Sequence, residues 1–150
     1  TIEGLEIAIQ KNPDVIFLLH GEGIADDIVP LAEKYSNVYF TLDTALLPGI
    51  YEFDNKEDFK ANFEKNFSSH LERSVSKWKP LIEKNPDSFV WGTDRGEGWH
   101  FDEEAGDYMV EMSRAFIGRL LPDVQEKFAY KNAQNMLGGE RQVPSRLLPQ

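Results

Sequence analysis

Short apolar runs alternate with longer amphipathic segments along this chain. The runs lie at residues 15–19, 38–42 and 88–93, and each is too short to be read as a helix and rich in bulky apolar residues. Residues 15–19 contain no polar position, which is typical of a strand covered on both faces. The pattern therefore predicts three strands at these positions.

The segments around these runs have apolar residues at helical spacing. A stripe that recurs every three or four positions from Phe59 to Ile82 predicts one long amphipathic helix, with Ser68 and Ser69 as the point where it could bend or break. The predicted helices are 2–11, 26–35, 59–84, 105–121 and a last one from 122 to about 138. Residues 44–57 and 95–104 are expected to form loops, and residues 139–150 a loosely held tail.

Alternating helices and strands imply parallel strands that are joined by right-handed crossovers. The carboxyl ends of parallel strands lie on one side of the sheet, where α/β folds collect their chemistry. The polar residues expected at the three strand ends are His20, Asp43 and Asp94. Three such residues predict one shared site, although Asp43 and Asp94 could instead be turn or cap residues.

Three parallel strands make a thin sheet whose two edges have unpaired backbone groups. A complete (β/α)8 TIM barrel takes about 250 residues, and this chain has 150. The sequence therefore predicts an α/β fold that is a partial (β/α)8 barrel, with three parallel strands and long helices. Residues 1–138 are expected to be its carboxyl-terminal part, and the start at Thr1 is read as internal.

Composition narrows the classes of partner. With 16 basic and 26 acidic residues the formal net charge is −10, which argues against nucleic acid and against anionic membranes, because both need a basic patch. No apolar run approaches the roughly 18 residues of a membrane span. The chain has no cysteine, which excludes disulfides and thiolate metal ligands and leaves the compartment open. A small-molecule substrate is the expected partner.

Four short motifs occur in a recognisable order. They are Asn12-Pro13-Asp14 before residues 15–23, residues 37–43, residues 89–94, and Lys131-Asn132-Ala133 followed by Met136-Leu137. In order and rough spacing they resemble barrel strands six, seven and eight and the closing helix of the amidohydrolase superfamily, in particular its amidohydrolase-related, decarboxylase-like branch. The resemblance covers about residues 2–138.

The resemblance implies roles for two residues. Asp94 would bind a divalent metal, expected to be zinc, and would orient or deprotonate metal-bound water. His20 would lie beside the metal and act on substrate or water. A divalent cation lowers the pKa of bound water to about 7, which makes this chemistry possible near neutral pH. Asn132 is expected to serve helix packing or capping.

The first-strand His-x-His pair and the fifth-strand ligand of that family have no counterpart here. The chain contains only His20, His70 and His100, and His70 is expected to be a packing or surface residue of the long helix. Asp94 and His20 alone are too few protein ligands for zinc. The isolated chain is therefore expected to be catalytically incomplete, and to pair with the missing barrel part or form a homo-oligomer.

Three further residues are candidates for binding substrate. Arg95 could bind a carboxylate with its planar guanidinium, and Asp43 and His100 follow strand ends in the sequence. The alternative for His100, together with Asp102 and Glu103, is a solvated acidic loop rather than a second metal site.

The predicted function is metal-dependent hydrolysis of a C–N or C–O bond, with metal-dependent decarboxylation, a lyase reaction, as the alternative. A non-catalytic half-barrel that binds another chain is a third possibility. Phosphoryl transfer to a strand-end aspartate lacks support, because the sequence shows no Asp-x-Asp motif after the first strand and no glycine-rich phosphate loop with a lysine.

Overall fold

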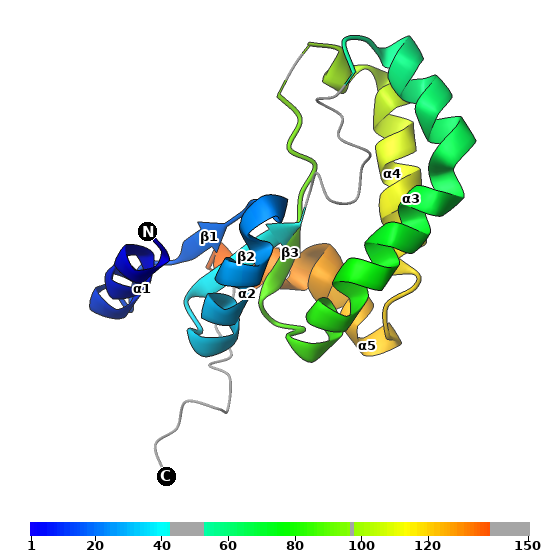
Figure 1. Cartoon of the computed structure of the whole chain (residues 1–150). Coiled ribbons are helices and arrows are strands. Elements are labelled where there is room, and N and C mark those ends of the chain that lie inside the picture. Colours follow the sequence, from blue (N-terminus) through cyan, green and yellow to red (C-terminus); the bar gives the residue numbers. More distant parts are fainter. Residues whose placement is uncertain (43–52, 97, 139–150) are drawn as a thin grey trace.

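The computed structural model describes residues 1–42, 53–96 and 98–138. Their strands are β1 (Phe17–Leu19), β2 (Val38–Leu42) and β3 (Phe89–Trp91), which form one parallel sheet in the order β1-β2-β3 (Figure 1). The predicted α/β class, the three strands and their parallel direction are confirmed. The predicted loop at 44–57 lies largely outside the described residues, and the predicted tail at 139–150 lies entirely outside them.

Two of the strands are shorter than the apolar runs predict. Val15 belongs to the turn before β1, where its N–H donates to the carbonyl of Asn12 at 3.1 Å. After β3, the N–H of Gly92 makes the last bond to β2, at 3.3 Å to the carbonyl of Leu42. An apolar run therefore marks where a strand lies, while the pairing partner decides where it ends.

Helices make up most of the described chain. The helices that flank the strands are α1 (Ile2–Lys11), α2 (Ala25–Lys34), α3 (Lys56–Lys84) and α4 (Glu103–Ile117), with 3-10 helices η1 (Glu22–Ile24) and η4 (Gly98–Phe101). The last helical region contains α5 (Pro122–Glu126), the π-helical turn η5 (Lys127–Lys131) and α6 (Asn132–Met136). The break considered near Ser68 and Ser69 does not occur, and the Ser69 hydroxyl donates to the carbonyl of Asn66 within α3.

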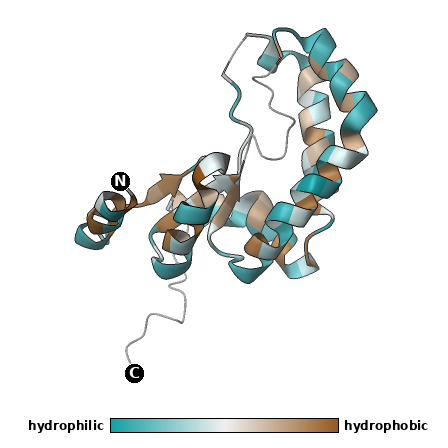
Figure 2. Ribbon diagram, viewed as in Figure 1, coloured by the Kyte–Doolittle hydropathy of each residue, from teal (hydrophilic) through white to brown (hydrophobic). Residues whose placement is uncertain are grey.

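The core lies where the carboxyl-terminal half of α3 crosses the sheet. Trp78 stacks on Phe40 of β2, with ring centroids 5.7 Å apart, and Phe40 also contacts Phe89 of β3 at 5.7 Å. All three side chains are buried. The apolar strands and the polar outer surface of α3 are visible in Figure 2. Burying each aromatic side chain contributes about 1.5–3 kcal/mol, so this contact fixes α3 on the sheet.

The same turn leads into β1 and into β3. Asn12 and Asn85 end α1 and α3 with nearly equal backbone angles, φ −129° and ψ 63° in the first and φ −129° and ψ 60° in the second. Each side-chain amide donates to the carbonyl four residues earlier, at 2.8 Å for Asn12 and 3.2 Å for Asn85. The repeated Lys-Asn-Pro-Asp sequence is thus a helix-to-strand turn that is used twice.

A buried asparagine binds the carbonyls of each of these turns. The amide of Asn37 donates to Asn12 at 3.2 Å and to Val15 at 2.9 Å. The amide of Asn132, which is 1% exposed, donates to the carbonyls of Pro86 at 2.8 Å and Phe89 at 2.7 Å. The structural role predicted for Asn132 is confirmed, since it joins the last helical region to the start of β3.

We expect Asn132→Ala to lower the free energy of unfolding by about 2–4 kcal/mol, because two hydrogen bonds are lost and two carbonyls keep no partner. Urea denaturation would measure this. Gln134→Ala, on the exposed side of the same helix, is the control and should change stability by less than about 0.5 kcal/mol. A loss as small as that of the control would contradict the role of Asn132.

Candidate functional site

The carboxyl ends of β1 and β3 lie at the same end of the parallel sheet. Leu19, the last residue of β1, pairs with Phe40, and Trp91, the last residue of β3, pairs with Leu42. His20 follows β1 directly and its side chain is exposed. Asp43, which follows β2, lies outside the described residues. The segments that contain His20 and Asp94 therefore both begin at the carboxyl end of the sheet.

β2 separates these two segments. Neighbouring strands are about 4.8 Å apart, so β1 and β3 are separated by about 10 Å. The described residues contain no group of three or more His, Asp or Glu side chains that could hold a metal ion. Imidazole and carboxylate are donors that suit zinc, but a catalytic zinc site takes three protein ligands.

Asp94 has an unusual backbone conformation. Its φ angle is 49°, and among the described residues it is the only residue other than glycine with a positive φ. Left-handed geometry is unfavourable for a residue with a side chain, although aspartate tolerates it better than most. Strain of this kind is found preferentially at functional sites. The side chain of Asp94 is exposed beyond the end of β3.

Arg95 is held against α4. Its Nε–H donates to the sulfur of Met109 at 3.2 Å, and the side chain is half-buried. A Cβ atom at position 106 would lie 2.7 Å from Nη2 of Arg95, so a side chain at this position would require the guanidinium to move. The sequence signal that could have pointed to this contact is the isolated Gly106 inside a predicted helix.

His100 does not lie with His20. In Figure 1 the segment after β3 leaves the sheet edge and rises to the amino ends of α3 and α4, where η4 lies. His100 is 1% exposed, its Nδ1 accepts the N–H of Gly96 at 3.3 Å, and its ring contacts Trp99 with centroids 4.5 Å apart. The expectation of a solvated loop is therefore wrong for His100, because its side chain is buried.

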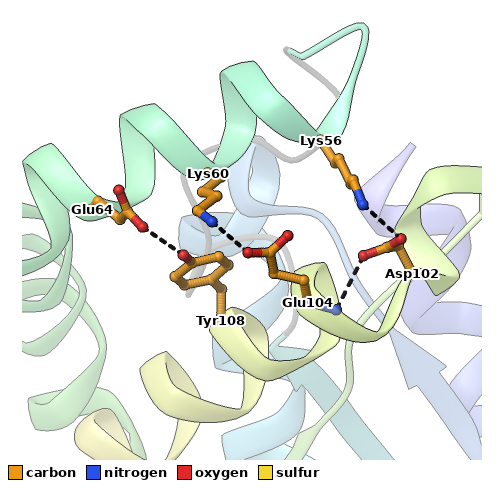
Figure 3. A network of polar contacts seen from close by, with 6 residues as sticks. All are labelled: Lys56, Lys60, Glu64, Asp102, Glu104 and Tyr108. Carbon is orange, nitrogen blue, oxygen red and sulfur yellow. Dashed lines mark hydrogen bonds and ion pairs between the residues drawn. The ribbon is translucent and has the colours of Figure 1, made fainter.

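Two layers of contacts hold η4 and α4 to α3. The inner layer is aromatic, and Phe59 contacts Trp99 at 5.5 Å and Tyr108 at 6.5 Å. The outer layer is the polar ladder of Figure 3, in which three successive turns of α3 contact the N-cap residue and the first turns of α4 in the same order. Its pairs are Lys56–Asp102 at 3.0 Å, Lys60–Glu104, and Tyr108, whose hydroxyl donates to Glu64 at 2.7 Å. The matching order means that α3 and α4 run parallel.

The hydrogen bonds of the ladder shift the pKa values of the side chains that form them. The Lys56 ammonium, which donates to Asp102, lowers the pKa of that carboxyl below its usual value. The hydrogen bond to Glu64 raises the pKa of the Tyr108 hydroxyl. Asp102 also caps α4, since its Oδ1 accepts the N–H of Glu104 at 3.0 Å. Asp102 thus links the helix start to α3.

Comparison with protein-family models, with curated proteins and with solved structures finds no significant match for this chain. None of the helices in the described ranges is long and apolar enough to cross a membrane.

The strain at Asp94 gives a prediction for a matched pair of variants. Asp94→Gly and Asp94→Ala both remove the carboxylate, but only glycine adopts a left-handed conformation without a steric cost. We expect the glycine variant to be more stable than the alanine variant by about 1 kcal/mol in urea denaturation. Equal stabilities would show that residue 94 does not hold this conformation in solution.

The contact between Lys56 and Asp102 predicts how the stability of the fold depends on pH. Because the pKa of Asp102 is lower in the folded than in the unfolded chain, its contact with Lys56 stabilises the fold above the unfolded pKa of about 4 and is lost as the pH falls through the folded value. We expect Lys56→Met to reduce the fall in melting temperature between about pH 5 and pH 2. Lys65→Met, at an exposed position of α3, is the control and should leave that fall unchanged.

Proposed function

We propose that this chain is the carboxyl-terminal part of a metal-dependent hydrolase built on a (β/α)8 barrel. The observation that carries the proposal is the shared edge of the parallel sheet, at which His20 follows β1 and the strained Asp94 follows β3. These are the residue types, the strand ends and the chain order that the resemblance to the amidohydrolase superfamily assigns to metal binding and catalysis.

The free edge of β1 supports the barrel part of this proposal. Phe17 and Leu19 direct their backbone groups to β2, as the 2.8 Å bond from the N–H of Phe17 to Asn37 indicates, so Leu18 directs its N–H and carbonyl away from β2. The Leu18 side chain is 47% exposed. The preceding helix α1 ends in the same turn as α3, which connects two parallel neighbours. A strand that precedes α1 in a barrel would therefore pair with β1.

Each residue has a defined task under this proposal. A divalent metal held there would supply a Lewis acid, which lowers the pKa of bound water to about 7. The carboxylate of Asp94 would hold the ion and accept a proton, and the imidazole of His20 would donate a hydrogen bond or a proton to the substrate. Arg95, directly after Asp94, binds an anionic group of the substrate. Decarboxylation by the same residues is the alternative reaction.

Zinc binding alone tests whether the site is complete in this chain. A catalytic zinc needs three protein ligands, and His20 and Asp94 supply two. In isothermal titration calorimetry we therefore expect the chain to lack a one-to-one zinc site tighter than about 1 µM. A tight stoichiometric site would contradict the proposal that the remaining ligands come from elsewhere.

A paramagnetic ion tests whether His20 and Asp94 share a site. When Co²⁺ is added in steps, the backbone amide signals of both residues should broaden at the same low concentration, and Asp94→Asn should raise that concentration for His20. The controls are His70 of α3 and the exposed acidic pair Asp26 and Asp27 of α2. Broadening of these controls before the two site residues would overturn the proposed metal site.

A further inference from the structure

The two lateral edges of the sheet differ in what covers them. On the side of β3 that faces away from β2, the carbonyl of Phe89 accepts the amide of Asn132 at 2.7 Å, and η5 and α6 pack against this strand. The other edge is β1, next to α1 in Figure 1, and β2 is its only strand partner among the described residues. An uncovered edge strand offers its backbone groups to another chain.

Ile16 and Leu18 direct their backbone groups away from β2. The carbonyl of Val15 accepts the Asn37 amide at 2.9 Å and the N–H of Phe17 donates to the Asn37 carbonyl at 2.8 Å, so both face the segment that leads into β2. Because the C=O and N–H of a trans peptide point in opposite directions, the N–H and carbonyl of Ile16 face outward. Those of Leu18 also face outward, since its two neighbours pair with β2. None of the residues that the structure describes bonds to these outward groups.

The side chains along the β1 edge are apolar in the middle and polar at the two ends. Val15 is 49% exposed and Leu18 47%, and Ile16 is half-buried. The exposed Asp14 precedes them and the exposed His20 follows them, and within the described ranges neither side chain has a hydrogen bond or an ion pair. The edge therefore begins with a carboxylate acceptor and ends with an imidazole donor.

We propose that β1 pairs with β1 of a second copy of this chain in a two-fold symmetric, antiparallel dimer. Two-fold symmetry requires antiparallel order of two identical edges, and this order places the start of one strand beside the end of the other. With Ile16 opposite Leu18 of the partner copy, each of the two such pairs exchanges both of its N–H···O bonds. The two sheets of three strands then form one continuous sheet.

The polar ends of the edge select this register and this partner. Asp14 lies two residues before Ile16 and His20 lies two residues after Leu18, so the carboxylate of one copy comes beside the imidazole of the other at both ends of the paired strands. A carboxylate that accepts an N–H makes a charge-assisted hydrogen bond. Ile16 and Leu18 project from the same face of the sheet, where apolar cross-strand neighbours stabilise the pairing. A second copy thus satisfies the outward backbone groups, the exposed leucine and both polar ends.

This dimer goes beyond the proposed function. A barrel strand that precedes α1 would occupy the same edge, so the two occupants exclude each other, and the inference concerns the chain of 150 residues by itself. Both copies carry a formal net charge of −10, which opposes their association. We therefore expect a weak dimer, with a Kd on the order of 0.1 mM.

Sedimentation equilibrium measures the dimer, and amide hydrogen exchange locates it. Between about 10 µM and 1 mM of chain, the average mass should rise toward twice that of one chain. Over the same range the amides of Ile16 and Leu18 should become protected from exchange. The amides of Phe17 and Leu19 pair with β2 and should be protected at every concentration, so they are the internal control.

Leu18→Pro tests the backbone pairing. Proline removes the outward N–H of residue 18 and leaves the bonds of its two neighbours to β2 in place, so it should weaken the dimer at least about tenfold. If this variant fails to fold, Leu18→Lys, which puts a charge on the edge, takes its place and should have the same effect. Leu121→Lys is the matched control, because Leu121 is 50% exposed, and it should leave the Kd unchanged.

A charge exchange tests the antiparallel register. Asp14→Lys removes the acceptor and His20→Asp brings two carboxylates together, so each alone should weaken the dimer about tenfold. Both substitutions in one chain restore opposite charges at both ends, and the Kd should return to within about threefold of the original value. Asp107→Lys, at an exposed position of α4, makes the same change in net charge as Asp14→Lys and should not weaken the dimer.

Three results would each overturn the dimer. They are a chain that stays monomeric up to about 1 mM, a Kd that the substitution of Leu18 leaves unchanged, and a double variant that dimerises no better than the single ones. The Co²⁺ titration can be made on the monomeric Leu18→Pro variant, so failure of the metal site and failure of the dimer are separate results.

Discussion

The two hydrogen bonds from the Asn132 amide to Pro86 and Phe89 fix where β3 begins. Residues 89–96 continue from there without a break, so the position of Asp94 and Arg95 depends on this buried amide from a much later part of the chain. Asn37 does the same for the turn before β1. Because a buried carbonyl without a partner is costly, each amide stabilises one orientation of its turn. These amides therefore fix β1 and β3 at their amino-terminal ends, whereas the candidate site lies beyond the carboxyl-terminal ends of the same strands.

The parallel pairing of α3 and α4 positions the segment that leads out of β3. Two parallel helices align their dipoles unfavourably, and the acidic first turns, Glu57 and Asp58 in α3 and Glu103 and Glu104 in α4, offset the positive potential at the shared end. Aromatic side chains fill the space between the helices, and the polar ladder fixes their register. Exposed ion pairs contribute little energy singly, so their main effect is to select one register. That register places η4, and with it His100 and Trp99.

The candidate site contains the left-handed backbone of Asp94 and the neighbouring guanidinium of Arg95, which packs on α4. Asp94 adopts its left-handed conformation three residues after the end of β3, and the next residue packs against Gly106 of α4. One carboxylate and one guanidinium therefore follow each other in the segment that leads out of β3.

The sequence by itself determined the strand positions, their alternation with helices and hence their parallel direction, because runs of apolar residues and helical spacing are local signals. It also indicated the packing role of Asn132. Only the tertiary structure decided that α3 stays unbroken, that His100 is buried, and that Arg95 lies on Gly106. Contacts such as Lys56 with Asp102 join residues 46 positions apart, and no local period encodes which helix faces meet.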